Sequence, residues 1–321
     1  MRLLFAGTPA AALPSLRALL DSEHEVVAVL TRPDAPQGRG RRLTPSPVKA
    51  LALEAGVPVL TPATLKDPDV QAELRELAPD AAPVVAYGAL IPPDALTIPA
   101  HGWINLHFSL LPAWRGAAPA QRAVLAGQDS TGMSVFRIAE GLDTGDVIAT
   151  SATPIGATET SGQLLDRMAV EGAPLLLRAL DELAAGTANF TPQDDDLATR
   201  AAKLTPAEAR VDWRRPAAEV SAHLRGMSPD PGAWSLLEGQ RVKLHGVGET
   251  PAGDLPALAP GQLHPTKRAL LVGTGTTPLA LDRLSPPGKR EMAAADWARG
   301  AGLAPGTAFE TFPEHPTQET A

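Results

Sequence analysis

The sequence predicts an α/β fold with a parallel-sheet domain, a linker and a small carboxyl-terminal β-barrel domain. Over residues 1–186, apolar runs of strand length alternate with segments of helical periodicity. Polar, helix-poor sequence follows, and beyond it short β-like runs are separated by glycine and proline. Because 321 residues exceed the usual size of one domain, we expect domains at residues 1–186 and 206–321, joined by a linker at residues 187–205.

The amino-terminal segment has strand–helix–strand order. Residues 1–7 form a short apolar run that ends in glycine, residues 10–22 are expected to be helical, and residues 25–31 form a second apolar run. This order predicts a right-handed crossover and therefore a parallel sheet with helices on both faces. The turn after the first strand lacks the G-x-G-x-x-G pattern, which disfavours a nicotinamide or flavin dehydrogenase.

Residues 32–49 (RPDAPQGRGRRLTPSPVK) are rich in proline, glycine and arginine and are predicted to form a long loop. The guanidinium groups of Arg39, Arg41 and Arg42 suit phosphate oxygens, which arginine binds in a bidentate manner. A solvated surface loop is the alternative, and the segment alone does not decide between the two. The formal net charge of -8 argues against bulk electrostatic binding of nucleic acid, so a polyanion would be held locally.

The remaining elements follow from the same patterns. In the first domain we expect helices at residues 46–56, 65–77, 119–127 and 160–183, and strands at residues 58–61, 80–87, 103–108, 133–138 and 147–151. In the second domain we expect a helix at residues 217–226 and strands at residues 233–237, 242–247, 269–272 and 279–284. The G-x-G at Gly273 and Gly275 lies between two of these strands and predicts a hairpin.

Residues 102–116 (GWINLHFSLLPAWRG) are typical of a strand that runs into a proline-containing loop. Asn105, His107 and Ser109 occupy alternate positions, so we expect their side chains to point to one face. Asparagine occurs only once more in the chain, at Asn189, and its place beside an imidazole in an apolar run favours a chemical role. The structural alternative is a half-buried strand whose polar face is satisfied by hydrogen bonds.

A further polar group, Asp143, lies in the glycine-rich loop EGLDTGD at residues 140–146. Open α/β proteins place their sites at the carboxyl edge of the sheet, and we expect this loop to meet Asn105 and His107 there. The order of the strands cannot be read from the sequence. The alternative for Asp143 alone is stabilisation of its own turn by an Asx-type hydrogen bond.

The chain has no cysteine, which excludes disulfides, thiolate metal sites and a cysteine nucleophile. It has no apolar run of membrane-spanning length and no signal sequence at the start. We therefore expect a cytoplasmic protein with no membrane partner and no metal.

The motif N-x-H-x-S-L-L-P together with GLDTGD resembles the signature of the N10-formyltetrahydrofolate-dependent formyltransferases. The opening FAGTP, the arginine loop, the run VVAYGALIP and the stretch KLTPAEARVDW extend the resemblance over nearly the whole chain. The resemblance implies a Rossmann-like parallel-sheet catalytic domain, a linker and a small OB-like β-barrel domain. It also implies that 10-formyltetrahydrofolate is the formyl donor.

The resemblance further implies roles for particular residues. Asn105 and His107 would donate hydrogen bonds to the oxyanion of a tetrahedral intermediate, while Asp143 would support His107 and accept the departing proton. The folate would contact the turn that follows the strand, at Ser109, Leu110, Leu111 and Pro112. For the two leucines, core packing is the alternative.

Within this family, the arginine loop and the barrel resemble members that act on initiator tRNA charged with methionine. Arg39, Arg41 and Arg42 would then contact the tRNA. The barrel would add nonspecific phosphate contacts from Arg241, Lys243, Lys267 and Arg268. A monomer is expected. The alternatives are a family member acting on an amino sugar or a purine precursor, and a noncatalytic tRNA-binding protein.

Overall fold

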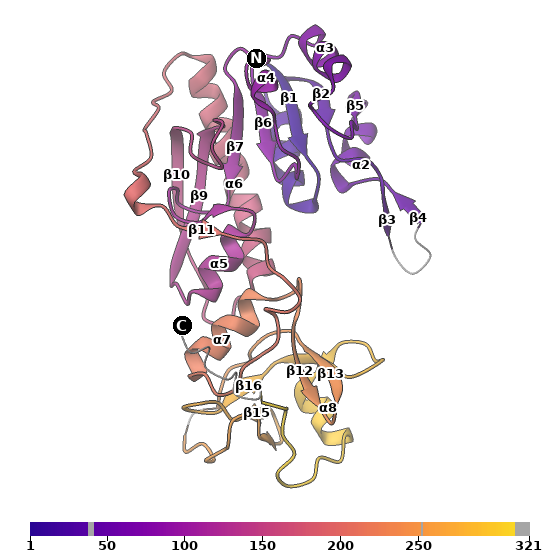
Figure 1. Cartoon of the computed structure of the whole chain (residues 1–321), viewed down its shortest axis with the longest axis vertical. Helices are drawn as coiled ribbons and strands as arrows, with labels where there is room; N and C mark the ends of the chain where they lie inside the picture. The colour runs from indigo at the N-terminus through magenta and orange to yellow at the C-terminus, as the bar shows by residue number, and fades with distance from the viewer. Residues whose placement is uncertain (38–41, 252, 312–321) are drawn as a thin grey trace, which may run out of the picture. The chain divides into compact units, whose positions relative to one another are not determined.

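The computed structural model describes residues 1–37, 42–251 and 253–311 (Figure 1). The chain divides into two compact units, and each unit is assembled from separate segments. The first unit comprises Met1–Pro119, Ser130–Pro154 and Leu165–Ala201. The second comprises Ala120–Asp129, Ile155–Leu164 and Ala202–Ala321.

The first unit is built on a seven-stranded sheet in the order β10-β9-β7-β6-β1-β2-β5. Its strands are β1 (Arg2–Gly7), β2 (Glu25–Leu30), β5 (Val59–Leu60), β6 (Ala82–Val85), β7 (Trp103–His107), β9 (Ser130–Arg137) and β10 (Val147–Pro154). The strands from β7 to β5 are parallel, whereas β9 pairs antiparallel with both β7 and β10. The predicted parallel α/β core is confirmed, but the expectation of a parallel sheet is wrong at this edge, where β9 and β10 form a hairpin.

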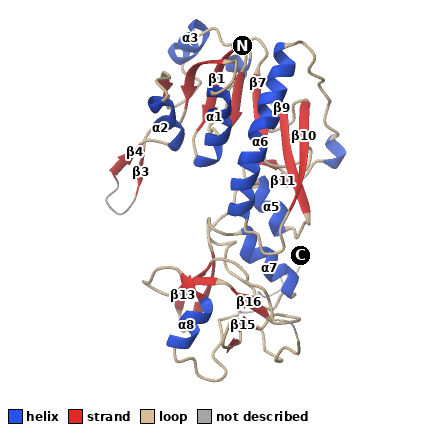
Figure 2. Ribbon diagram, turned by 180° about the vertical axis from the view of Figure 1, so that it is seen from behind, coloured by secondary structure: helices blue, strands red, loops and turns tan. Residues whose placement is uncertain are grey.

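Helices cover this sheet. They are α1 (Leu13–Leu20), α2 (Pro47–Glu54), α3 (Pro68–Glu76), α4 (Pro93–Leu96) and α6 (Ser161–Ala184), with a 3-10 turn, η1 (Ala10–Ala12), before α1. Figure 2 shows α1 and α6 over the same face of the sheet. On strand β7, Leu106 lies on the face toward α6, where Gly172 leaves room for its side chain. Since side chains alternate along a strand, Asn105 and His107 belong to the opposite face.

The arginine-rich segment at residues 32–49 is not a plain loop. It contains a short antiparallel pair formed by β3 (Ala35–Gln37) and β4 (Arg42–Thr44). The prediction of an unpaired loop was therefore wrong, because three cross-strand backbone pairs shorten it. Arg39 and Arg41 lie outside the described residues, and of Arg42 only the backbone is described.

The second unit contains two antiparallel sheets and three helices among its described residues. The first sheet has the order β12-β13-β17-β18 and the second β14-β15-β16. The elements are α5 (Pro119–Leu125), α7 (Ala217–Gly226), α8 (Ala294–Gly300), β12 (Ala233–Leu237), β13 (Gln240–Leu244), β14 (Leu263–Pro265), β15 (Leu270–Val272), β16 (Leu279–Leu281), β17 (Arg283–Ser285) and β18 (Met292–Ala293). The predicted hairpin at Gly273 and Gly275 is confirmed, since these glycines join β15 to its partner β16.

The core of the second unit is centred on Trp213. Its ring stacks on Phe309 at 5.4 Å between centroids, and its indole N–H donates to the Ser235 hydroxyl at 2.9 Å. An isolated bridge between Val247 and Leu281 links the chain after β13 to β16 of the other sheet. Among the described helices, none is both long enough and apolar enough to cross a bilayer.

Candidate active site

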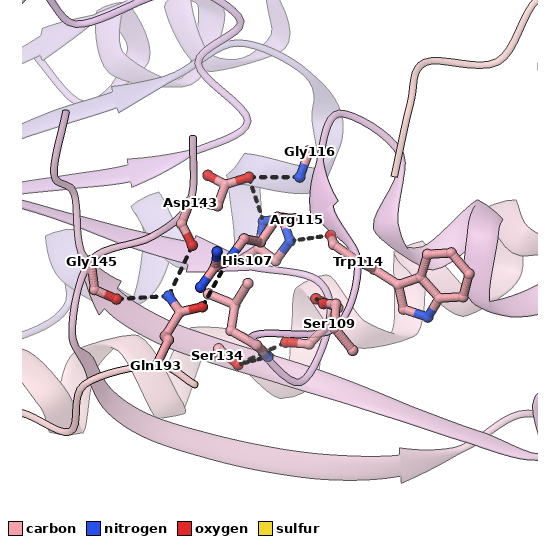
Figure 3. A network of polar contacts seen from close by, with 11 residues as sticks. His107, Ser109, Trp114, Arg115, Gly116, Ser134, Asp143, Gly145 and Gln193 are labelled. Atoms are coloured by element: carbon pink, nitrogen blue, oxygen red, sulfur yellow. Dashed lines mark hydrogen bonds and ion pairs between the residues drawn. The ribbon is translucent and has the colours of Figure 1, made fainter. Parts of the chain in front are cut away.

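His107, at the end of β7, is the centre of the site. Its side chain is buried, with 6% of its surface exposed. Its Nε2 atom lies 2.9 Å from the carbonyl oxygen of Trp114 (Figure 3). A carbonyl oxygen can only accept, so Nε2 carries a proton and donates it. In the neutral ring, the Nδ1 atom is then the one with a free lone pair.

Asp143 faces this second nitrogen. Its Oδ2 atom lies 3.9 Å from His107 Nδ1 and accepts a hydrogen bond from the backbone N–H of Gly116 at 2.8 Å. The distance to Nδ1 exceeds that of a hydrogen bond, so the interaction between the two side chains is electrostatic. The structure thus brings together the predicted pair His107 and Asp143, which are 36 positions apart in the sequence.

The strand that leads into the Asp143 loop has a different direction from the one we predicted. We expected a meeting at the carboxyl edge of parallel strands, but β9 runs antiparallel to β7, and Arg137 at its end lies opposite Ile104. The loop after β9 therefore starts near the amino-terminal half of β7 and turns back to reach His107. The turn is tight, since a Cβ at Gly145 would overlap the carbonyl oxygen of Arg137.

Asn105 lies one strand pleat before His107 and is half-buried. Among the residues that the structure describes, none forms a hydrogen bond with its side-chain amide. An amide that is partly buried and has no protein partner remains free to donate to a substrate oxygen. The structure therefore does not support the alternative in which Asn105 only satisfies the polar face of a strand.

The protonation state of His107 follows from its surroundings. Burial lowers the pKa of His107 below its usual value of 6.5, while the Asp143 carboxylate and the Trp114 carbonyl oppose this shift. The net direction is downward, so the imidazole is neutral at pH 7. A neutral imidazole beside a carboxylate can accept a proton at Nδ1, because the resulting positive charge is stabilised by Asp143.

The turn after β7 carries the four residues predicted to contact folate. The Ser109 hydroxyl donates to the carbonyl oxygen of Ala113 at 2.6 Å, so it stabilises the turn and does not extend the polar row of the strand. Ser134 on β9 fixes the same turn, accepting from the Leu111 N–H at 2.9 Å and donating to the Ser109 carbonyl at 2.8 Å. Leu111 is buried, whereas Leu110 and Pro112 are partly exposed.

A segment that the sequence indicated only as part of a linker also belongs to this site. Residues 190–201, here called the strap, lie against the Asp143 loop. The Gln193 side-chain amide donates from Nε2 to the carbonyl oxygens of Asp143 and Gly145, at 2.8 and 2.7 Å (Figure 3). Its Oε1 atom accepts from Arg115 Nε at 3.0 Å, and Arg115 also pairs with Asp195 at 2.7 Å.

The strap also contacts the loop that holds the Trp114 carbonyl. Its short strand β11 (Arg200–Ala201) pairs in parallel with β8 (Arg115–Gly116). The Thr199 hydroxyl accepts from the Trp114 N–H at 2.8 Å. At Gly116, a Cβ would lie 2.6 Å from the Ala201 carbonyl oxygen, so only glycine allows this close approach. No periodic pattern predicts these contacts, because the strap is polar and nearly free of regular structure.

Within the described parts of the chain, no group of three or more His, Asp or Glu side chains is arranged to hold a metal ion. The site thus consists of the Asn105 amide and the buried neutral imidazole of His107, on the face of β7 away from α6, together with the Asp143 carboxylate from the loop after β9. This combination suits acyl transfer to an amine, in which an oxyanion forms and a proton is released.

Comparison with known proteins gives the class of protein. The family model described as "Formyl transferase" matches residues 1–180, and the model described as "Formyl transferase, C-terminal domain" matches residues 203–302. The chain belongs to the formyl transferase family, and the resemblance predicted from its motifs is confirmed.

Particular members of the family are similar along their whole length. The chain is 58% identical to the methionyl-tRNA formyltransferase of Parafrankia sp. (strain EAN1pec) over 309 residues, which cover 96% of this chain and 98% of the relative. It is 55% identical to the methionyl-tRNA formyltransferase of Thermobifida fusca (strain YX), with 96% and 99% covered. The sequence similarity therefore extends over both units of the chain.

Solved structures share the fold at much lower identity. An N-formyltransferase from Helicobacter canadensis, in complex with folinic acid and dTDP-3-aminofucose, matches with a TM-score of 0.67 at 16% identity, covering 87% of this chain and 98% of that chain. HypX from Aquifex aeolicus, in complex with tetrahydrofolic acid, matches with a TM-score of 0.64 at 20% identity, covering 98% of this chain and 51% of that chain.

Proposed function

We propose that this protein transfers the formyl group of 10-formyltetrahydrofolate to the α-amino group of methionyl initiator tRNA. The observation that carries the proposal is the buried His107, held between the Trp114 carbonyl and the Asp143 carboxylate beside the free amide of Asn105. Relatives with 52–58% identity over nearly their full length are named for this activity.

The nucleophile needs little activation. The α-amino group of an aminoacyl ester has a pKa of about 8 or lower, so much of it is uncharged at neutral pH. No covalent enzyme intermediate is required. The enzyme has to stabilise the negative charge on the formyl oxygen and remove one proton from the attacking nitrogen.

The three site residues meet these two needs. Asn105 donates its free amide hydrogen to the developing oxyanion. The Nε2 proton of His107 is already bound by Trp114, so we assign the ring a different contribution from the direct N–H donation expected from the sequence. Its Nδ1 atom accepts the proton from the attacking amine, and Asp143 stabilises the imidazolium. The tetrahedral intermediate then collapses: the bond between the formyl carbon and the folate nitrogen breaks, and the imidazolium returns its proton to that nitrogen.

The formyl donor is placed by the turn at Ser109, Leu110, Leu111 and Pro112. Ser134 and Ser109 hold this turn rigid through three hydrogen bonds. A rigid turn with partly exposed apolar side chains and backbone groups suits a folate ring system. The leucine that is buried, Leu111, contributes mainly its backbone.

The decisive test uses purified protein, 10-formyltetrahydrofolate and methionyl initiator tRNA, with formylmethionine measured after hydrolysis of the ester. We expect catalytic formation of formylmethionine, and we expect the KM for the tRNA to rise with salt concentration. A nucleotide-linked amino sugar and a purine precursor amine, tested in parallel, are expected to give no product. Formylation of either one, with none of the tRNA, would exclude the proposed substrate.

Arg39 is the residue whose replacement we expect to affect tRNA binding most. It lies in the arginine-rich segment between β3 and β4, outside the described residues. Arg39→Ala should raise the KM for methionyl-tRNA about tenfold or more and leave the KM for the folate nearly unchanged, because a guanidinium–phosphate contact is lost. Arg17→Ala, on α1, provides a control for the loss of one arginine. The reverse pattern, with a raised KM for folate alone, would refute this role.

Further proposals concern organisation. We propose domains at residues 1–186 and 206–321 joined by a linker at residues 187–205, supported by family models that end at residue 180 and begin again at residue 203. Within this linker, residues 190–201 pack on the first unit as the strap. The two sheets of the second unit support an OB-like barrel that binds tRNA phosphates. There, the guanidinium group of the exposed β13 residue Arg241 stacks over the Trp234 ring, 4.4 Å from its centroid.

We also propose that the protein acts as a monomer in the cytoplasm.

A further inference from the structure

We propose that Gln193 is a positioning residue for the reaction: its side-chain amide holds the Asp143 loop so that the carboxylate faces His107. The inference rests on the proposed function, because it requires Asp143 to act during formyl transfer. Gln193 forms no hydrogen bond with the imidazole of His107 or with the side-chain amide of Asn105.

The backbone of the Asp143 loop needs a support of this kind. Asp143 has a φ of 54°, in the left-handed region that residues other than glycine rarely adopt. Its carboxylate contacts Gly116 and faces His107, so a rotation of the backbone would move Oδ2 away from both. The Arg137 N–H closes the base of the loop by donating to the Asp146 carbonyl at 3.0 Å, whereas the backbone hydrogen bond next to Asp143 is long, with 3.5 Å between the Thr144 nitrogen and the Gly141 carbonyl oxygen.

Gln193 holds this backbone from outside the loop. Both hydrogens of its amide are used, one on the carbonyl of Asp143 and one on the carbonyl of Gly145, at 2.8 and 2.7 Å. These carbonyls belong to Asp143 itself and to the residue two positions later, so the amide holds the backbone of the loop from Asp143 to Gly145. Because Gln193 binds backbone carbonyl groups, its two hydrogen bonds do not involve the Thr144 side chain.

Gln193 is itself fixed. Arg115 donates to its Oε1 atom at 3.0 Å, which leaves the amide nitrogen as the group that faces the loop. Two residues earlier, Thr191 forms a reciprocal pair of backbone hydrogen bonds with Val147, at 2.8 and 2.9 Å. The strap is thus anchored beside Gln193 to the first residue of β10.

The test compares variants in full-length protein. Gln193→Met keeps the length of the side chain but removes both donors, and we expect kcat for formyl transfer to fall about 10- to 100-fold, because small displacements of a catalytic group have effects of this size. The KM values for tRNA and folate should stay nearly unchanged. Gln193→Glu keeps the acceptor for Arg115 but cannot donate to the two carbonyls when ionised, so it should not restore activity.

Gln71 provides a matched control. It donates from Nε2 to the Leu65 carbonyl at 2.9 Å and accepts from Arg75 at 3.1 Å, so it has the same kind of partners on α3. Gln71→Met should lower the melting temperature about as much as Gln193→Met does, and leave kcat unchanged. An equal loss of kcat in both variants would show that the effect is one of stability.

A double-mutant cycle separates positioning from other effects. If Gln193 acts through Asp143, then Gln193→Met should cause no further loss of kcat in an Asp143→Asn background. Losses that multiply would overturn the inference, and so would normal turnover by Gln193→Met beside an active wild type. A wild type that formylates no tRNA would overturn the proposed function, and the inference with it. An inactive wild type would contradict the proposed function, whereas an active wild type with a normal Gln193→Met variant would contradict only the role of Gln193.

Discussion

Asn105→Ala is expected to reduce kcat/KM for formyl transfer about 100- to 1,000-fold. One preorganised donor to an oxyanion contributes roughly 3–4 kcal/mol in the transition state. Asn105 is suited to this role because it is half-buried and its amide has no hydrogen-bond partner among the described residues. Most of the loss should appear in kcat, because the oxyanion exists only during the transfer.

The other asparagine of the chain provides the control. Asn189 is exposed and lies before the strap, so Asn189→Ala should retain full activity. The melting temperature of Asn105→Ala should stay close to that of the wild type, since no protein hydrogen bond is lost. Steady-state kinetics with methionyl-tRNA provide the measurement. Turnover within a few-fold of the wild type would remove Asn105 from the mechanism.

Asp143→Asn is expected to lower kcat about 100-fold or more. The substitution keeps an oxygen that can accept from the Gly116 N–H, but it removes the negative charge 3.9 Å from His107 Nδ1. The Asp143 charge raises the pKa of His107 against the effect of burial, so its loss lowers that pKa further. The imidazole then becomes a weaker base, and the protonated ring loses its stabilising partner.

The same loop contains the control for this substitution. Asp146 lies three residues further on, is partly exposed and pairs with Arg137 at 3.5 Å. Asp146→Asn removes an equal charge from the EGLDTGD loop and should change kcat less than threefold, since exposed ion pairs contribute little. The kcat values of both variants should be compared across pH 6–8. Equal losses in the two variants would assign the effect to the overall charge of the loop.

The sequence predicted the central strands and the site residues better than it predicted their arrangement. Strands β1, β2, β6 and β7 were predictable because buried parallel strands are short apolar runs. The polar residues of β7 stood out because an asparagine and a histidine interrupt such a run. The direction of β9 was not predictable, since its residues have the same alternation whether the strand runs parallel or antiparallel to β7.

The contacts of the strap were not predicted from the sequence, for a different physical reason. Its contacts are hydrogen bonds of single side chains and short backbone pairs, as at Gln193, Thr199 and β11. None of these leaves a periodic pattern in the sequence, and polar segments without periodicity are typical of linkers. The hairpin of β3 and β4 was missed likewise, because Pro36 within one of its strands is unfavourable for pairing.

The close pairing of β8 with β11 bears on where the polypeptide can be cut. Every residue assigned to the chemistry lies before position 146, and a fragment that stopped at residue 186 would contain all of them. Such a fragment would lack Gln193, Thr199 and the Ala201 carbonyl that lies against Gly116. Truncation at that position would separate the reactive groups from the side chains and backbone that keep them in place.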